Sequence, residues 1–302
     1  MSKPIGFIGA SGLMGHGMAK HLLAKGHGLV LHVNTRPQRV ADLLAAGATL
    51  AESRADMAAE CELVFLCVTG SPQVQESVGA LLEGRRALPE PRPPLMIVDC
   101  STSEPAGSRQ MREWCAALDA VFIDAPLTRT PVEAEAGRLN VMVGAEPEDF
   151  ARLEPILRCF AENVFHAGGP GAGHIVKLLN NFVSQAICTA TAEAFAVGKK
   201  AGVDPRRLVE VVSAGGANSG LFQAMAKTLD GDLTGLVFEL DNARKDIRYY
   251  THLAEDLAVP TVVGEGVHQS LVLASALGHG RKFVPSLVEA QEQLAGTQIV
   301  PR

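Results

Sequence analysis

Short, unbroken apolar runs alternate with amphipathic segments from residue 4 to about residue 167, and this alternation constrains the fold most strongly. Parallel strands that helices cover on both faces are apolar throughout, because neither face meets water. We therefore expect a doubly wound α/β domain over residues 1–167. The expected strands are residues 5–8, 29–33, 63–68, 95–99, 121–123, 140–143 and 164–166.

The pattern changes after AGGPGAG, residues 167–173, because the following segments are helical and no convincing strand appears. We place the domain boundary here and expect an all-helical domain over residues 168–302. One long helix, from residue 173 to about residue 201, would join the two domains. Asp204 followed by Pro205 is typical of the start of a further helix.

Composition excludes several classes of partner. With 302 residues, 47% of them hydrophobic, the chain can bury a large core in two domains. A net charge of −6 argues against nucleic-acid or anionic-membrane partners, but it leaves room for a small anionic substrate. No stretch reaches about 18 unbroken apolar residues and no export signal is evident, so we expect neither membrane insertion nor export.

Cysteine and histidine usage indicates a cytoplasmic protein without a metal centre. The six cysteines are scattered and never form a CxxC pair, which is typical of reduced core thiols. The nine histidines show no metal-ligand spacing, and we expect no metal.

The segment from Pro4 to His27 reads as a short apolar strand, a glycine loop and a helix. Gly9 permits a tight turn, Gly12 lets a pyrophosphate approach the main chain, and Gly15 allows close packing of helix and strand. The spacing GxxGxxG has one residue more than the usual GxGxxG, and a purely structural turn is the less favoured alternative. We predict a Rossmann domain that binds a dinucleotide at the positive start of the helix. The predicted contacts are Gly9, Ala10, Ser11, Gly12, Leu13 and Met14.

The residues after the second strand predict which dinucleotide is bound. A carboxylate there would bind the ribose hydroxyls of NAD and repel a 2′-phosphate. The stretch reads VNTRP instead, and the first carboxylate is Asp42. We predict NADP, with NAD as the alternative, and place Arg36, beside Asn34 and Thr35, on the 2′-phosphate. An arginine in a surface loop can also be simply solvated.

Two threonines follow later strands, at the carboxyl edge where open α/β sheets bind ligands. We expect Thr69 and Thr102, together with Val68, to line the cofactor site. Either threonine could instead cap a helix, as could Ser103, and the two roles can coexist.

One lysine and two asparagines interrupt the apolar run GAGHIVKLLNN, residues 171–181. Helical spacing places Lys177, Asn180 and Asn181 on one face, and a buried helix must meet polar partners along such a stripe. The stripe is either a snorkelling lysine beside hydrogen-bonded core asparagines, or a catalytic lysine with substrate contacts. His174 lies one turn before Lys177 and could tune its pKa.

Six motifs resemble, in order, the β-hydroxyacid dehydrogenase family, which includes 3-hydroxyisobutyrate dehydrogenases and tartronate semialdehyde reductases. They are GFIG…GLMGxxMAxxLxxxGH, VFLCVTGSPQV, DCSTSEP, DAPLTRT…AGRLNVMVG, GAGHIVKLLNN and RKDIRYY, and they span nearly the whole chain. The resemblance implies that Lys177 is the catalytic lysine and that Thr102 lines the nicotinamide pocket. It also implies a substrate-binding asparagine at Asn180 or Asn181, and further site residues in the second domain, namely Phe238, Lys245 and Asp246.

The stretch DAPLTRT departs from the DAPVSGG of most relatives. Thr128, Arg129 and Thr130 replace a serine and two glycines that cradle a carboxylate, and bacterial sulfolactaldehyde reductases look similar here. An arginine offers a planar, permanently charged fork to a carboxylate, sulfonate or phosphate. We expect these three residues to bind a small anionic substrate, with Arg129 as its anchor. Otherwise Arg129 points to solvent or pairs with Glu133 or Glu135.

We interpret the sequence as an NADP-dependent 3-hydroxyacid dehydrogenase or semialdehyde reductase. Hydride transfer at a carbon changes the charge on its oxygen, so a proton must move as well, and Lys177 would act as general acid or base. Partial burial would lower the pKa of this lysine from its usual value of about 10.4. Apolar helices of the second domain favour a homodimer or homotetramer. Two alternatives stay open: an oxidative decarboxylase like 6-phosphogluconate dehydrogenase, and a non-catalytic dinucleotide-binding protein.

Overall fold

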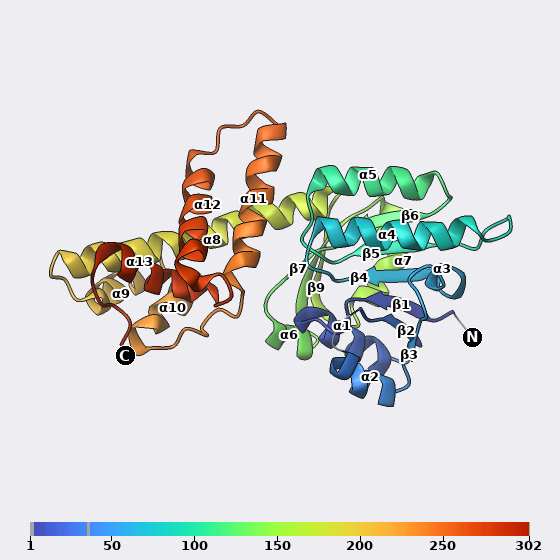
Figure 1. Ribbon diagram of the computed structural model, residues 1–302, viewed down its shortest axis with the longest axis horizontal. Coiled ribbons are helices and arrows are strands. Elements are labelled where there is room, and N and C mark those ends of the chain that lie inside the picture. Colours follow the sequence, from blue (N-terminus) through green and yellow to red (C-terminus); the bar gives the residue numbers. More distant parts are fainter. Residues whose placement is uncertain (1–2, 35–36, 302) are drawn as a thin grey trace. The chain divides into compact units, whose positions relative to one another are not determined.

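A computed structural model describes residues 3–34 and 37–301 of the chain (Figure 1). The chain forms two compact units, Met1–Lys177 and Leu178–Arg302. The long helix α8 (Ala172–Lys200) contributes its first residues to the first unit and the rest to the second. Among the helices of the described residues, none is long and apolar enough to cross a membrane.

The first unit is built on one sheet with the strand order β3-β2-β1-β4-β5-β6-β8-β7, and β9 pairs with β8. Strands β1 to β6 are parallel, whereas β8 is antiparallel to β6 and β7. The chain order reverses between β1 and β4, and open α/β sheets bind ligands at such a point. The strands are β1 (Ile5–Ile8), β2 (Leu29–His32), β3 (Thr49–Leu50), β4 (Leu63–Leu66), β5 (Met96–Asp99), β6 (Val121–Asp124), β7 (Leu127–Thr128), β8 (Leu139–Gly144) and β9 (Ala161–Gly168).

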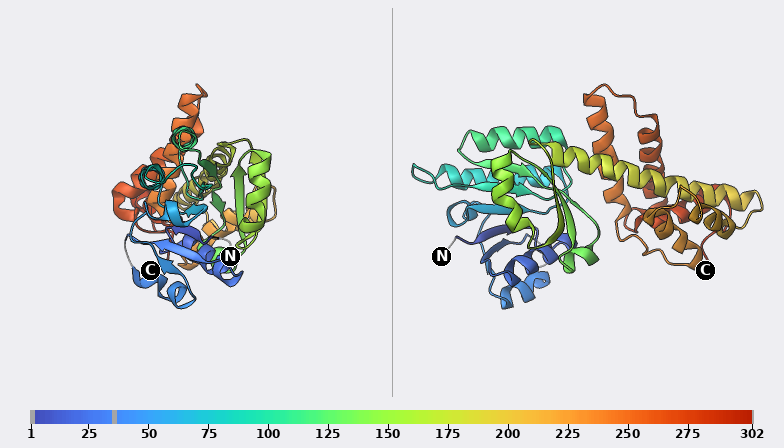
Figure 2. Two further views of the ribbon diagram at one scale, coloured as in Figure 1. Left: turned by 90° about the vertical axis from the view of Figure 1, so that its right-hand side faces the viewer. Right: turned by 180° about the vertical axis from the view of Figure 1, so that it is seen from behind.

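Helices cover both faces of this sheet (Figures 1 and 2). Alternate strand residues point to opposite faces, so Phe7 and Phe65 enter one core, whereas Val64 and Leu66 enter the other. Helices α1, α2 and α7 close the first core, and α3, α4 and α5 close the second. The helices are α1 (Leu13–Ala24), α2 (Ala41–Ala45), α3 (Met57–Glu60), α4 (Ser71–Arg86), α5 (Pro105–Ala116), α6 (Pro131–Glu135), α7 (Pro147–Leu157) and the 3-10 turn η1 (Pro37–Val40).

The second unit is helical over its described residues. The amphipathic faces of α8, α11 and α12 bury Phe195, Ile247 and Leu271 in one shared core. Beyond α8, the elements are α9 (Pro205–Ser213), α10 (Gly220–Ala226), α11 (Leu240–Asp256), α12 (Val262–Ala274), α13 (Leu287–Ala295) and the short helical turns η2 (Lys227–Asp230), η3 (Ser275–His279) and η4 (Val284–Ser286).

The expected fold class is confirmed, with differences at the ends of elements. Strand β4 ends at Leu66, earlier than expected, because the main-chain N–H of Val68 donates to the Ser101 hydroxyl (2.9 Å). Helix α11 begins at Leu240, directly after Glu239, which forms an isolated antiparallel bridge with Phe283. The sequence pattern does not predict β3 and β7, since two-residue strands are too short to show a period.

Candidate functional site

The glycine loop between β1 and α1 lies directly against the end of β4. Gly9 has a positive φ of 102°, and a Cβ there would lie 2.1 Å from the carbonyl oxygen of Cys67. A Cβ at Gly15 would lie 2.3 Å from the carbonyl oxygen of Gly9. Both positions therefore require glycine, one for the turn and one for close packing of the helix on the loop.

The start of α1 is suited to an anion. Gly12 is its N-cap, no acidic residue lies in its first turn, and Leu13 is exposed. Unpaired main-chain N–H groups and the helix dipole attract phosphate at such a position. Ala10 is buried, and Ser11 and Met14 are half-buried in the same turn. The predicted dinucleotide contacts thus form one continuous segment.

The residues predicted to select NADP are described only in part. Asn34 follows β2 and is exposed. Thr35 and Arg36 lie outside the described residues, so their assignment to the 2′-phosphate stays a prediction.

The loops after β4 and β5 are linked to each other. Besides the Val68–Ser101 hydrogen bond, the main chain of Glu104 donates to the Ser71 hydroxyl at 2.8 Å. The N-caps of α4 and α5 are Gly70 and Glu104, so neither of the predicted threonines occupies the cap position. Thr69 is exposed and Thr102 is half-buried.

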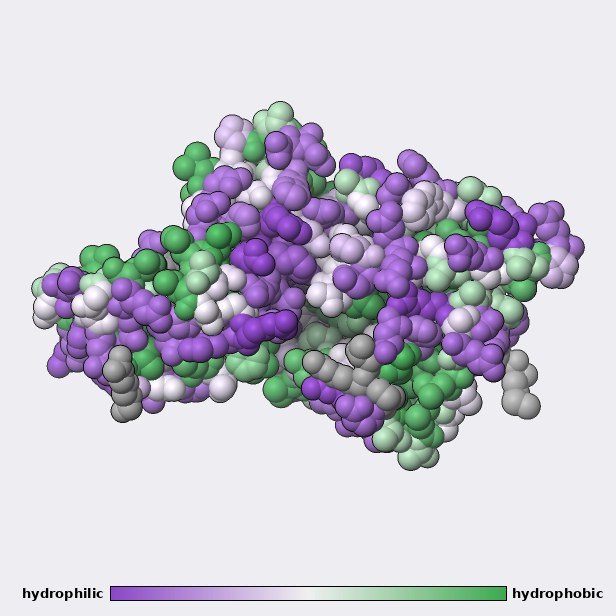
Figure 3. Space-filling view, in the orientation of Figure 1, coloured by the Kyte–Doolittle hydropathy of each residue, from purple (hydrophilic) through white to green (hydrophobic). Residues whose placement is uncertain are grey.

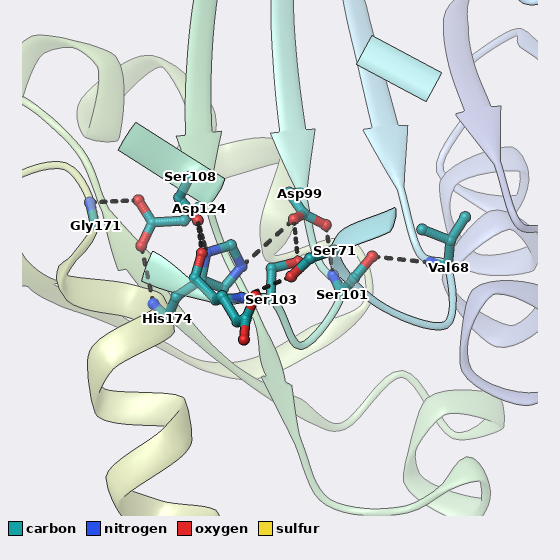
Figure 4. A network of polar contacts seen from close by, with 10 residues as sticks. Val68, Ser71, Asp99, Ser101, Ser103, Ser108, Asp124, Gly171 and His174 are labelled. Atoms are coloured by element: carbon teal, nitrogen blue, oxygen red, sulfur yellow. Dashed lines mark hydrogen bonds and ion pairs between the residues drawn. The ribbon is translucent and has the colours of Figure 1, made fainter. Parts of the chain in front are cut away.

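Two fully buried aspartates end neighbouring strands at the carboxyl edge of the sheet (Figure 4). Asp99 ends β5 and accepts hydrogen bonds from the Ser101 main chain and the Ser103 hydroxyl, both at 2.8 Å. The Ser103 hydroxyl therefore donates to Asp99, and Ser103 is not the N-cap of a helix. These contacts fix the loop that carries Thr102.

Asp124, at the end of β6, holds the start of α8. Its carboxylate accepts the N–H of Gly171 at 2.7 Å and that of His174 at 2.9 Å, as an N-cap side chain would. Gly173 permits this contact, since a Cβ there would lie 2.4 Å from a carbonyl oxygen of β8. Lys177 follows one turn later and is half-buried. The sheet edge thus determines where the helix of Lys177 begins.

Arg129 adopts a positive φ of 79°, a conformation that favours glycine. Its guanidinium donates to the carbonyl oxygen of Arg138 and forms an ion pair with Glu162. The hydrogen bond from Arg129 lowers the pKa of the Glu162 carboxyl. In this structure Arg129 therefore pairs with a residue of β9 and not with Glu133 or Glu135.

Thr128 and Thr130 flank Arg129 and hold its loop in place. Thr128 accepts a hydrogen bond from the Asn140 amide at 3.1 Å. Thr130 is the N-cap of α6 and forms a capping box with Glu133. The hydrogen bond from Thr130 also lowers the pKa of Glu133, against its slight burial. The loop is thereby fixed between β7 and α6.

Within the second unit, part of the polar stripe of α8 meets α11. Asn181 donates to the Asp246 carboxylate at 2.6 Å, and the Lys245 amine lies 3.0 Å from the other carboxylate oxygen. Asn180 donates to the Asn181 side-chain oxygen at 3.1 Å. Asn181 is thus a buried, hydrogen-bonded asparagine, and Phe238 packs against the core of the same unit.

His16 connects α1 to α2 and α6. Its ring nitrogens lie 2.7 Å from the Glu135 carboxylate and 3.0 Å from the Asp42 carboxylate, and Lys20 lies 3.1 Å from Glu135. Partial burial alone would lower the pKa of His16, but the hydrogen bonds to the two carboxylates outweigh it and raise the pKa. Among the described residues, no group of three or more His, Cys, Asp or Glu is arranged to hold a metal.

No sequence pattern predicts a role for Asp99, Asp124 or Ser108. Each aspartate comes directly after an apolar run and is the first residue of a motif, DCSTSEP or DAPLTRT. A carboxylate at the end of a fully buried strand needs hydrogen-bond donors. This requirement is the sequence signal from which a structural role of the two aspartates could have been inferred. Which donors it meets depends on the strand order, which the sequence alone does not show.

Two family models together cover most of the chain. Residues 4–168 match the model described as the NAD binding domain of 6-phosphogluconate dehydrogenase. Residues 171–289 match the model described as NAD-binding of NADP-dependent 3-hydroxyisobutyrate dehydrogenase.

Individual relatives agree with these matches. A 3-hydroxyisobutyrate dehydrogenase of Pseudomonas aeruginosa is 36% identical over 214 residues, 70% of this chain and 70% of that protein. A 2-(hydroxymethyl)glutarate dehydrogenase of Eubacterium barkeri is 29% identical over 303 aligned residues, 98% of this chain and 97% of that protein. The structure of a Mycobacterium tuberculosis 3-hydroxyisobutyrate dehydrogenase with L-serine has a TM-score of 0.85 at 22% identity, covering 96% and 99% of the two chains. At 22% identity, the similarity to this structure shows a shared fold and nothing more.

Replacing His16 by Gln should remove a pH-dependent part of the stability. Because the pKa of His16 is raised above its ordinary 6.5, its contacts stabilise fully below that pH and are lost as the pH rises through the raised value. The pKa values of Asp42 and Glu135 are lowered, so their contribution is lost only as the pH falls through those lowered values. In denaturant unfolding, the difference between wild type and His16→Gln should be larger at about pH 6 than at about pH 9. An equal difference at both pH values would contradict this coupling.

Proposed function

Because this chain belongs to the β-hydroxyacid dehydrogenase family and is an NAD(P)-dependent hydroxyacid dehydrogenase, we propose that it moves a hydride between NADP(H) and a small anionic 3-hydroxy acid or its semialdehyde. The proposal rests on one observation: the helix that carries Lys177 begins at the same edge of the sheet as the glycine loop. A Cβ at Gly9 would push that loop away from the end of β4, so the tight turn expected of a dinucleotide-binding loop depends on glycine at this position.

Lys177 is the proposed general acid and base. A nicotinamide dinucleotide held by the glycine loop would supply the hydride-transfer chemistry in either direction. In oxidation, an unprotonated Lys177 amine takes the proton of the substrate hydroxyl as the carbonyl forms. In reduction, the Lys177 ammonium returns this proton to the oxygen. The lysine must therefore sit within hydrogen-bond reach of that oxygen, which requires a fixed helix start.

Arg129 is the proposed anchor for the anionic group of the substrate. Its present partner Glu162 has a half-exposed side chain, and such ion pairs are weak because water screens the two charges. A substrate carboxylate or sulfonate can therefore replace Glu162 at small cost and bind the guanidinium fork. Thr128 and Thr130, which fix the loop, stay proposed as further substrate contacts.

The remaining predicted residues keep their proposed roles. Val68, Thr69, Thr102 and Lys245 are proposed cofactor contacts. Asn180, Asn181, Phe238 and Asp246 are proposed substrate contacts, with the Asn181–Asp246 hydrogen bond orienting the asparagine amide.

A homodimer or homotetramer is the proposed assembly. Exposed apolar side chains occur on α8 and α12, among them Val183, Val197, Val262 and Val263, and Figure 3 shows apolar groups on the surface of the second unit. Contact with a second copy would remove such groups from water. The six free cysteines support the cytoplasm as the proposed compartment.

Lys177→Ala should lower kcat at least about a thousandfold while NADPH still binds, because only the proton-transfer group is lost. Turnover of small 3-hydroxy acids and semialdehydes is followed by NADPH absorbance, and NADPH binding by fluorescence titration. Lys199→Ala, at the exposed end of the same helix, is the matched control and should keep wild-type kcat. Near-normal turnover by Lys177→Ala would refute the assignment.

Arg129→Gly should raise KM for anionic substrates about ten- to a hundredfold, since a charge-assisted hydrogen bond contributes about 1.5–3 kcal/mol. Glycine also suits the positive φ at this position, so the variant should fold at least as well as wild type. Matched carboxylate and sulfonate substrates are compared, with Arg138→Ala as a control that removes an equal charge nearby. If KM is unchanged for both substrates, Arg129 does not anchor them.

Arg36→Ala should raise KM for NADPH about tenfold or more and leave KM for NADH unchanged, because only NADPH carries the 2′-phosphate. Arg39→Ala, which changes an exposed arginine in the turn η1, serves as control. A strong preference of the wild type for NADH, unaltered in Arg36→Ala, would show that the assignment of NADP is wrong.

A further inference from the structure

His174 is a fully buried histidine on the first turn of α8, three residues before Lys177. Its ring contacts two other elements at once (Figure 4). Nδ1 lies 2.6 Å from the Ser108 hydroxyl of α5, and Nε2 lies 3.5 Å from the Asp99 carboxylate that ends β5. The second contact does not meet hydrogen-bond geometry, so Nε2 lies beside the carboxylate without a hydrogen bond to it.

The main chain of the same turn is held separately. The N–H groups of Gly171 and His174 donate to Asp124, which fixes how far the helix start lies from the sheet edge. Both hydrogen bonds act on the main chain, close to the helix axis, where a contact opposes rotation about that axis less than one made farther out. The imidazole of His174 extends away from the axis, so its contacts with Ser108 and Asp99 oppose that rotation.

We propose that His174 is a positioning residue for Lys177, an inference that rests on the proposed function. Residues three apart on a helix share a face, so a rotation that moves the His174 ring also moves the Lys177 amine. Proton transfer needs the amine within hydrogen-bond reach of the reacting oxygen, and a displacement of about 1 Å can lower the rate about a hundredfold. His174 touches neither reactant and acts only through the orientation of this turn.

Three substitutions of His174 separate its contacts. His174→Leu keeps much of the side-chain volume and removes both polar contacts. His174→Asn places an amide near the position of Nδ1 and can keep the Ser108 contact, whereas His174→Gln reaches toward Asp99. Thr191→Val removes a buried hydroxyl that donates to the Ile187 carbonyl of the same helix at 2.7 Å, and controls for a general loss of stability.

His174→Leu should lower kcat about ten- to a hundredfold, while substrate KM and the Kd of NADPH stay within about twofold. At least one of His174→Asn and His174→Gln should recover most of the lost kcat, and Thr191→Val should keep wild-type values. Wild-type kcat in folded His174→Leu would overturn the proposal. So would an equal worsening of kcat, KM and Kd in all three variants, because that pattern indicates general disruption.

Ser108→Ala decides the question if His174→Leu does not fold. It removes the Nδ1 partner from α5 without changing α8, and kcat should fall several-fold at unchanged KM; unchanged kcat would overturn the proposal. Lys177→Ala is measured in the same series. If Lys177→Ala retains turnover, the proposed function is wrong and the positioning role falls with it. If it is inactive while His174→Leu keeps wild-type kcat, only the positioning role is wrong.

Discussion

Two buried carboxylates at the ends of neighbouring strands, Asp99 and Asp124, organise the carboxyl edge of the sheet. A carboxylate without water must be surrounded by donors, because an unpaired buried charge costs several kcal/mol. Asp99 meets this need with the loop that carries Thr102, and Asp124 meets it with the first N–H groups of α8. The loop that lines the proposed cofactor site and the helix that carries Lys177 are therefore placed by the same requirement.

Close main-chain approach is the second constraint at this edge. A Cβ at Gly144 would lie 2.5 Å from the Asp124 carboxylate, and a Cβ at Gly173 would meet β8. The glycine loop after β1 approaches the end of β4 in the same way through Gly9. The lysine helix and the dinucleotide loop thus both lie against strand ends that leave no space for a side chain.

The sequence predicts the alternating first unit, the helical second unit and the long helix between them, because each rests on local periodicity that survives in the fold. It also identifies the positions where only glycine fits the dinucleotide loop. It does not predict contacts that depend on strand order. Glu162 lies 33 residues from Arg129 and reaches it because β7 and β9 both pair with β8. Ser108 lies 66 residues from His174, and their contact likewise requires the assembled sheet.

The proposed proton transfer depends on the Lys177 amine reaching the oxygen at which the substrate gains or loses its proton. A crystal structure of the protein with NADP and a bound 3-hydroxy carboxylate measures this directly. We expect the lysine Nζ at about 2.6–3.2 Å from the substrate hydroxyl oxygen. An Nζ that faces bulk solvent, with another ionisable group within reach of that oxygen, would contradict the account.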